Sequence, residues 1–482
     1  MVTSTDLVNS IPLVIAAASS LIILIIEAIF PKANKSKGET IIFYFSLLAL
    51  VVALSFAFKD FNKNLSLYNN FIRVNTITAA LNVTLIFGML MTVLSSKDYL
   101  EIENINYGEY YALLFLSLLG MMLLVGANDL VTLFIGLELM SVCFYVLAGF
   151  IRTKPESNES GLKYFLLGAF VTGFLLLGIA FIYGFSGNTN YTVIASKGLT
   201  KESFYMLGII LVFIAFVFKT GSFPLQMWVP DVYQGSPTVV AGMMSSVGKT
   251  AAFGALLSFF AVFDLKNVPL MIAAVSVLTM LYGNVVALMQ SDIKRLLAYS
   301  SIAHAGYIMI GFIQISSSST QAVLYYLVSY ILMQLGAFIV VGIVEAKSDT
   351  SGSSASTNTI ESYKGLGKTN PGLASILTVF LFSLAGIPPL AGFWGKYYIF
   401  YSIIQARFYW VAVVGILLSL IGVYYYIRII LYMWFYEPSA GTVEPVKKDF
   451  AFTAAVLSTI GIFVFGIFPQ LVLKYISTIA LL

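Results

Sequence analysis

The sequence predicts an all-α polytopic membrane protein, and three observations support this fold class. Of the 482 residues, 59% are hydrophobic and only 10% are charged, which is unlike any soluble globular class. Apolar runs of about 20 residues, enough to span a hydrocarbon core of about 30 Å, recur along the whole chain. Glycine and proline interrupt two of these runs, which a membrane helix tolerates where the freed backbone groups face protein or a wet cavity.

We predict about fourteen spanning helices from these runs. Their approximate ranges are 9–30, 41–58, 75–95, 109–127, 129–150, 161–184, 203–228, 237–262, 269–289, 293–313, 321–345, 371–400, 408–436 and 450–478. The first run lacks a basic leading region and contains Glu27, so we expect a retained helix rather than a signal peptide. The longest connection, 346–370, is rich in serine and predicts a flexible polar linker.

Alternate loops differ in their content of lysine and arginine. The richer set includes Arg152, Lys154, Lys347, Lys447 and Lys448. The positive-inside rule therefore places the serine-rich linker in the cytoplasm and both termini on the outer, periplasmic side. The net charge of +4 is too small to indicate nucleic acid as a partner.

Cysteine and histidine are almost absent from the chain. A single cysteine, Cys143, and a single histidine, His304, cannot ligate an iron–sulfur cluster through four cysteines or build a structural zinc site. No glycine-rich phosphate loop follows a strand-like run. We therefore expect no cofactor in this chain, and any redox chemistry must belong to partner subunits.

Two interrupted runs share similar text. One reads Phe216-Val-Phe-Lys-Thr-Gly-Ser-Phe-Pro224, and the other reads Phe380-Leu-Phe-Ser-Leu-Ala-Gly-Ile-Pro388. Alignment of these prolines puts Ser383 opposite Lys219 and leaves Lys396 beyond the second break. The second run is an odd number of spans after the first, so it crosses the membrane in the opposite direction. Interrupted helices in two inverted halves indicate a transport site.

Ionisable side chains lie deep within several spans. At 1.5 Å per residue, Glu138 lies about 15 Å and His304 about 16 Å from the end of its helix, near the bilayer centre. Lys219 precedes the first break, Lys249 lies well inside the next span, and Lys396 follows the second break. Charge at membrane depth is expensive, so these residues are candidates for an ion or proton pathway.

Each candidate also has a purely structural interpretation. Glu138 could be a protonated carboxyl in an apolar bundle, His304 a satisfied core residue, and Lys219 a lysine that extends to the interface. Lys163 lies near the start of its span, so extension to the interface explains it as well as a functional role does. Arg428 lies within the thirteenth predicted span, but an arginine keeps its proton and so cannot take part in a proton relay.

The order of these residues, together with two stretches of text, resembles a known family. The stretches are Trp228-Val-Pro-Asp-Val-Tyr-Gln-Gly-Ser-Pro-Thr238 and Asp292-Ile-Lys-Arg-Leu-Leu-Ala-Tyr-Ser-Ser-Ile-Ala-His304. The chain resembles the antiporter-like membrane subunits of proton-pumping NADH:quinone oxidoreductase (respiratory complex I), and among them subunit N. An M-type subunit is expected to have a glutamate where this chain has Lys396.

The resemblance implies a domain organisation. Two inverted five-helix repeats would comprise spans four to eight and nine to thirteen, with discontinuous helices seven and twelve. The expected units are an N-terminal three-helix segment, a first repeat, a second repeat that contains the linker 346–370, and a final helix fourteen, with the bounds 1–108, 109–262, 263–436 and 437–482.

The resemblance also implies roles for the candidate residues. Glu138 would pair with Lys219, and Lys249 would connect the two half-channels. His304 and Lys396 would continue the relay to the outer face, and Lys163 would lie on the cytoplasmic input side. Redox-driven change elsewhere would alter the separation of Glu138 and Lys219 and so push a proton along the row.

By the same resemblance, the partners are other membrane-arm subunits, the lipid bilayer and protons, in a bacterial inner (plasma) membrane. NADH, FMN, iron–sulfur clusters and quinone would belong to the partner subunits. Two alternatives stay open. A subunit of a multi-subunit cation/proton antiporter would share the fold, although the text at 233–238 argues against it. A structural membrane-arm subunit would have no need of buried ionisable groups.

Overall fold

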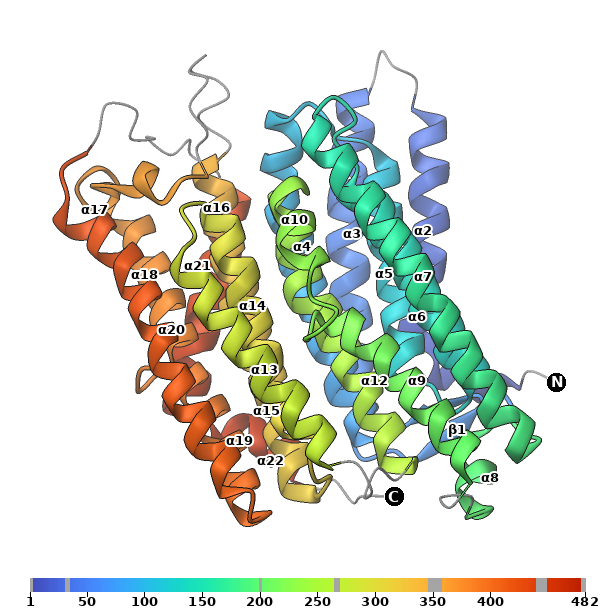
Figure 1. The fold of residues 1–482 in the computed structure, drawn as a ribbon. Coiled ribbons are helices and arrows are strands. Elements are labelled where there is room, and N and C mark those ends of the chain that lie inside the picture. The colour runs from blue at the N-terminus through green and yellow to red at the C-terminus, as the bar shows by residue number, and fades with distance from the viewer. Residues whose placement is uncertain are drawn as a thin grey trace.

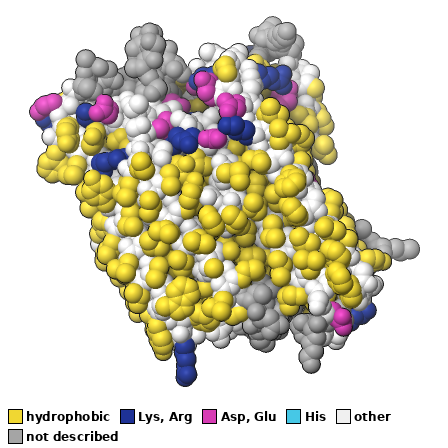
Figure 2. Space-filling view, in the orientation of Figure 1, with side chains coloured by type: hydrophobic (Ala, Val, Ile, Leu, Met, Phe, Trp, Pro, Cys, Tyr) yellow, Lys and Arg dark blue, Asp and Glu magenta, His cyan; other side chains and the backbone are white. Residues whose placement is uncertain are grey.

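The computed structural model describes residues 3–30, 35–198, 202–263, 269–345, 358–438 and 449–477, and these residues form a bundle of long helices (Figure 1). Within these ranges, 12 helices are long and apolar enough to cross a membrane. Hydrophobic side chains cover most of the visible middle of the bundle, and charged side chains gather mainly at its upper end (Figure 2). The prediction of an all-α polytopic membrane protein is confirmed.

The N-terminal part of the chain follows the predicted spans. Its elements are α1 (Ser4–Asn9), α2 (Ile11–Ile29), α3 (Lys35–Phe58), the antiparallel strands β1 (Leu65–Leu67) and β2 (Ile72–Val74), α4 (Thr76–Ile102), α5 (Gly108–Val125), α6 (Leu130–Ala148), α7 (Pro155–Ser186) and α8 (Tyr191–Ser196). Side-chain caps fix several helix starts: Asn75 accepts a hydrogen bond from the Thr78 amide, and Asp129 accepts one from Val131.

The central part contains two helices with internal π-helical turns. Its elements are α9 (Ser203–Thr220), α10 (Trp228–Gly235), α11 (Thr238–Met243), η2 (Met244–Gly248), α12 (Lys249–Val262), α13 (Pro269–Leu288), α14 (Ile293–Ile310), α15 (Ser317–Tyr330), η3 (Ile331–Leu335) and α16 (Gly336–Glu345). The turns η2 and η3 interrupt the α-helical hydrogen-bond pattern in the middle of two otherwise continuous helices. Such turns occur frequently at functional sites.

The C-terminal part corrects two predictions. Its elements are η5 (Ile360–Tyr363), α17 (Leu366–Thr369), α18 (Pro371–Ala385), α19 (Ala391–Gln405), α20 (Tyr409–Phe435), α21 (Asp449–Ile467) and α22 (Gln470–Ile476). Residues 346–357 of the predicted linker lie outside the described residues, but 358–370 are folded and not a flexible linker, because Ile360 and Tyr363 are buried. The last predicted helix ends at Ile467, and Pro469 separates it from α22.

Two predicted spans differ from the others. The tenth, α14, is not among the 12 helices that are long and apolar enough to cross a membrane. The twelfth is divided into the shorter helices α18 and α19. Helices occupy all the predicted ranges, whereas the exact number of crossings and the inverted repeats stay predictions.

The two interrupted helices end with the same backbone geometry. Helix α9 stops at Gly221 (φ +68°) and α18 stops at Gly386 (φ +88°), the left-handed conformation that glycine adopts without a steric cost. In both, the second residue after the helix donates its amide five residues back, from Ser222 to Val217 and from Ile387 to Phe382. Alignment of Gly221 with Gly386 therefore gives the register between the two interrupted helices.

This register corrects the alignment made on the prolines. Lys219 lies two residues before Gly221, and the residue two before Gly386 is Leu384, not Ser383. The error arose because Pro388 and Pro389 are adjacent and the sequence alone does not say which of them matches Pro224.

Elements near the two ends of the chain lie at the same end of the bundle. Helix α1 is bound to the β1–β2 hairpin, since the Asp6 carboxylate accepts a hydrogen bond from the Tyr68 amide and Ser10 shares one with the Tyr68 hydroxyl. The labels β1 and α22 both lie at the lower end of the view, and α17 lies at the upper end (Figure 1). Of the loop lysines used to predict orientation, Lys347, Lys447 and Lys448 lie outside the described residues.

Candidate functional site

The first broken helix places a lysine against side chains of α6. Lys219 lies in the last turn of α9 and is 5% exposed. Its Nζ donates to Ser141 Oγ at 2.7 Å and to Tyr145 Oη at 3.1 Å, and lies 5.2 Å from the centre of the Tyr145 ring. The break itself is closed by Trp228, whose indole N–H donates to the Phe218 carbonyl at 3.0 Å. The lysine charge is therefore directed away from its own helix end.

Glu138 belongs to the same cluster but is not bonded to Lys219. It lies one turn before Ser141 on α6, and its Oε1 accepts a hydrogen bond from Thr172 Oγ1 of α7 at 2.7 Å. Glu138 forms no ion pair within the part of the chain that the structure describes, but Ser141, one turn further along α6, accepts a hydrogen bond from Lys219. The predicted Glu138–Lys219 pair is thus two neighbouring groups, with Ser141 and Tyr145 bound to the lysine.

Lys249 is fully enclosed at the start of α12, directly after the turn η2. Its Nζ donates to the carbonyl oxygen of Ser301 at 2.9 Å and to Ser301 Oγ at 3.0 Å. It also lies beside the first break, because a Cβ added at Gly221 would be 3.4 Å from this Nζ. Lys249 therefore touches both the break in α9 and the buried face of α14.

His304 lies one turn after Ser300 and Ser301 on α14 and is 1% exposed. Both ring nitrogens have tyrosine partners: Nδ1 is 2.8 Å from Tyr326 Oη, and Nε2 is 3.2 Å from Tyr426 Oη. Nothing in the sequence distinguished these two tyrosines from the other members of a set of 29.

The second broken helix places its lysine differently. Lys396 is in α19, after the break, and its Nζ donates to the carbonyl oxygens of Leu384 and Ala385 at 3.0 and 2.9 Å. These carbonyls form the open C-terminal end of α18, where a positive charge is favoured. The ammonium also lies 5.1 Å from the centre of the Tyr307 ring.

A cluster of partly exposed charges lies beside the first break, one turn after Trp228. Lys163 of α7 binds Asp231 at 3.0 Å, and Asp231 binds Arg295 at 2.7 Å. Partial burial raises the pKa of the Asp231 carboxyl, but the hydrogen bonds from Arg295 and Lys163 outweigh this and hold it below its usual value. The Lys163 side chain is 42% exposed, in accord with its interpretation as a residue near the surface.

Arg428 has a structural position. Its guanidinium donates to the carbonyl oxygens of Leu288 and Gln290 at 3.0 and 2.5 Å, at the C-terminal end of α13. It therefore caps a helix, which suits a group that keeps its proton.

Sequence reasoning missed a second buried charge pair. Lys294, which is 3% exposed, lies 3.7 Å from Glu345 at the end of α16, and its Nζ donates to the Ser236 carbonyl at 2.9 Å. Glu345 also bonds to Thr238 at the start of α11. The Asp-Ile-Lys-Arg text that begins at Asp292 contains this lysine, but the sequence does not show that Glu345 lies beside it.

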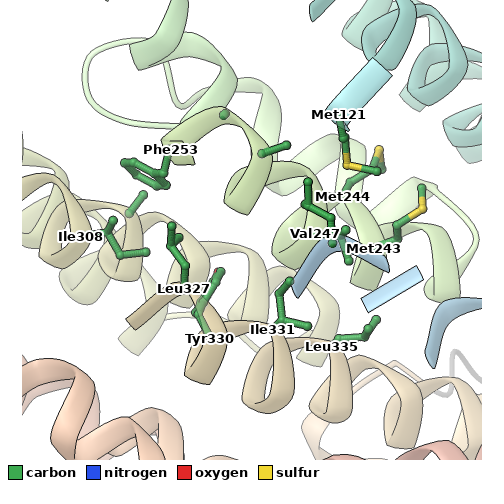
Figure 3. Close-up of a cluster of buried hydrophobic side chains, with 14 of the residues drawn as sticks. Met121, Met243, Met244, Val247, Phe253, Ile308, Leu327, Tyr330, Ile331 and Leu335 are labelled. Atoms are coloured by element: carbon green, nitrogen blue, oxygen red, sulfur yellow. The ribbon is translucent and has the colours of Figure 1, made fainter. Parts of the chain in front are cut away.

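Apolar side chains pack around the two π-helical turns. Figure 3 shows Met243, Met244 and Val247 close to Ile331 and Leu335, so the turns η2 and η3 face each other in this cluster. Gly88 of α4 is enclosed by Val247 and Ile331. Lys219, Lys249, His304 and Lys396 are buried in this part of the bundle, whereas Glu138 is partly exposed.

Comparison with known proteins identifies similar chains. Residues 127–422 match the family model described as NADH:quinone oxidoreductase/Mrp antiporter, TM. The chain is 39% identical to NADH-quinone oxidoreductase subunit N of Trichlorobacter lovleyi, over 96% of this chain and 95% of that protein. It is similar to a chain in a structure of respiratory complex I from Thermus thermophilus, with a TM-score of 0.82, 31% identity and coverage of 96% and 98%.

A chain of the Mrp complex from a Dietzia species shares the fold. The TM-score is 0.81, with 19% identity and coverage of 99% of this chain and 97% of the other.

Proposed function

The chain belongs to the NADH:quinone oxidoreductase/Mrp antiporter membrane family, and from this premise we propose that it is a proton-translocating, subunit N-type member of the membrane arm of NADH:quinone oxidoreductase. The observation that supports this most directly is the row of buried lysines at two broken helices, Lys219, Lys249 and Lys396. Each is enclosed, and each contacts oxygen atoms that can accept a proton or stabilise an ammonium.

In the proposed mechanism, the distance between Glu138 and Lys219 controls the proton affinity of the lysine. A carboxylate that approaches an ammonium favours the charged form, and one that withdraws disfavours it. Ser141 and Tyr145 hold the Lys219 ammonium at present, so a small movement of α6 changes its surroundings. The released proton passes to Lys249 beside the break, and then by way of His304 to Lys396.

Partner chains supply the driving energy and the redox groups. NADH, FMN, iron–sulfur clusters and quinone are placed in partner subunits, and neighbouring membrane-arm subunits bind this chain laterally. The protein lies in a bacterial inner membrane with both termini periplasmic and the Lys163–Asp231–Arg295 cluster at the cytoplasmic end, where protons enter. The labels β1 and α22 lie at one end of the bundle (Figure 1), and α1 binds the β1–β2 hairpin, which supports the placement of both termini on one side of the membrane.

The family relationship also supports a second candidate, a subunit of a multi-subunit cation/proton antiporter. The fold similarity to a chain of the Mrp complex favours it. Purification separates the two: co-purification with redox subunits supports the first function, and a complex that exchanges cations without redox subunits supports the second.

The test of the proposed function is Lys219→Ala in the assembled complex, with quinone-reductase activity and proton pumping measured in proteoliposomes. We expect assembly to persist while both activities fall, because alanine has no group that can hold the proton at this position. Lys474→Ala, which changes an exposed lysine of α22, is the matched control and should retain both activities. If Lys219→Ala pumps like this control, the lysine is a tolerated buried charge and the subunit is structural.

A further inference from the structure

The imidazole of His304 bridges two helices through hydroxyl groups. Tyr426 comes from α20 and Tyr326 from α15, and each hydroxyl lies within hydrogen-bond distance of a different ring nitrogen. Both tyrosines and His304 are at most 1% exposed. A histidine bound on both sides by groups that donate and accept can receive a proton at one nitrogen and release one from the other.

The hydrogen bonds continue beyond the imidazole. Tyr426 Oη also shares a short hydrogen bond with Ser300 Oγ, one turn before His304 on α14. The four groups can therefore be ordered with every donor in one direction: Ser300 donates to Tyr426, Tyr426 to Nε2, and Nδ1–H to Tyr326. The first three donors each have an acceptor, and the hydroxyl hydrogen of Tyr326 is left to donate beyond the four groups.

No carboxylate contacts the His304 ring in the part of the chain that the structure describes. The side chains around the ring are those of Tyr307, Tyr326, Tyr330 and Tyr426. A positively charged imidazole would therefore have no negative partner beside it. Transfer through a neutral ring, by exchange of its tautomer, avoids this charge.

We propose that Ser300, Tyr426, His304 and Tyr326 form a proton wire in which the neutral imidazole exchanges its tautomer. The proposal rests on the function proposed above and adds two tyrosines and a serine to its relay. In one transfer, the Lys249 ammonium loses a proton toward Ser300, Ser300 gives its hydroxyl proton to Tyr426, and Tyr426 gives its own to Nε2. Nδ1 then gives its proton to Tyr326, and Tyr326 releases its hydroxyl proton toward the neutral amine of Lys396. Each group of the wire keeps its charge, while Lys249 becomes a neutral amine and Lys396 becomes an ammonium.

The two ends of the wire adjoin residues that contact or precede the lysines of the row. Lys249 donates to Ser301, which follows Ser300 on α14. Tyr326 packs closely against Gly395, which precedes Lys396, since a Cβ added at Gly395 would be 3.2 Å from the tyrosine ring. These two contacts are the basis on which we place the wire between Lys249 and Lys396.

The test uses Tyr426→Phe and Tyr326→Phe in the assembled complex, because each removes one hydroxyl and keeps the ring. We expect pumping-linked turnover to fall on the order of tenfold or more in each, since loss of a positioned proton-transfer group costs at least that much. The double variant should be no worse than the slower single variant, because residues of one wire do not act independently. The isotope effect of D₂O on turnover should rise in both single variants.

Tyr330→Phe is the matched control. Its ring lies 5.4 Å from that of His304 and is fully buried, but its hydroxyl is not bonded to His304. Equal losses in Tyr330→Phe would show that packing, not proton transfer, is affected and would overturn the wire. Ser300→Ala removes the first hydroxyl without changing a ring. If this variant turns over at the wild-type rate, the wire is overturned, even where a phenylalanine variant does not assemble.

Failure of the wire is distinguishable from failure of the proposed function. If the tyrosine variants retain turnover while Lys219→Ala loses it, the wire is wrong and the function stands. If Lys219→Ala also retains pumping, the function itself is wrong.

Discussion

The two broken helices end in the same way but hold their lysines differently. At the first break, Lys219 precedes Gly221 and binds Ser141 and Tyr145, which follow Glu138 on the same face of α6. At the second, Lys396 follows Gly386 and binds the carbonyls of α18. The first lysine thus has a titratable neighbour that can change its charge, whereas the second has fixed backbone dipoles. We infer that control of proton affinity lies at the first break.

The tryptophans near the breaks emphasise this difference. Trp228 donates to Phe218 and so occupies the open carbonyl end of α9. Trp394 donates instead to Gly466 of α21, at 2.7 Å, and leaves the end of α18 to Lys396. Similar text around the two prolines therefore produces two different ways to satisfy a helix end.

The largest effect is expected from Glu138→Gln, which removes the titratable neighbour from the first break. A nearby opposite charge changes proton affinity by one to three powers of ten, so activity and pumping should fall by about tenfold or more. Thr172→Val keeps the carboxylate and removes only its hydrogen bond, so its loss should be smaller. Quinone-reductase activity and proton pumping of both variants in proteoliposomes test this prediction. Wild-type pumping by Glu138→Gln would contradict the inference that proton affinity is controlled at the first break.

Alanine at the two glycines should have an intermediate effect, on stability. The left-handed conformation costs a residue with a Cβ roughly 1–2 kcal/mol. At Gly221 the new Cβ would also be 2.6 Å from Val229 Cγ2, whereas at Gly386 it would be 3.0 Å from Cδ of the flexible Lys396 chain. Gly221→Ala should therefore lower the thermal unfolding midpoint of the purified complex more than Gly386→Ala does.

The control for both glycines is Gly173→Ala. This position lies within α7 and has nothing within 4 Å of an added Cβ, so alanine there should leave the unfolding midpoint unchanged or raise it. An equal decrease in all three variants would show that the left-handed helix ends do not determine stability.

The smallest effect is expected from Asp231→Asn, in the exposed cluster beside the first break. Ion pairs at exposed sites contribute about 0–1 kcal/mol. Because the pKa of Asp231 is below its unfolded value, the pairs stabilise above a pH of about 4 and lose this contribution as the pH falls through the folded pKa. The unfolding midpoints of wild type and variant should differ slightly at pH 7 and converge in acid; a difference that grows in acid would contradict this.

Helix positions were predictable because each apolar run is long enough to span a bilayer, and this signal is local. The fold of residues 358–370 was not, since Ile360 and Tyr363 become buried only through contacts with distant segments. Likewise, hydropathy does not reveal that Pro469 ends the last long helix before α22 begins.

The buried ionisable residues of the site were visible in the sequence because charge is rare at membrane depth. Their partners were not. Ser141 and Tyr145, which bind Lys219, are ordinary residues of an apolar helix until the fold brings them together. The same holds for Tyr326 and Tyr426, whose relation to His304 depends on the packing of three helices.

The π-helical turn η2 determines the direction in which Lys249 points. An α-helix rotates about 100° per residue, and a π turn accommodates one extra residue within the helix. All side chains beyond Gly248 are therefore rotated by about 100° relative to an uninterrupted helix that starts at Thr238. Lys249 is the first of them, so its alignment with Ser301 depends on the length of the preceding backbone as much as on its own rotamer.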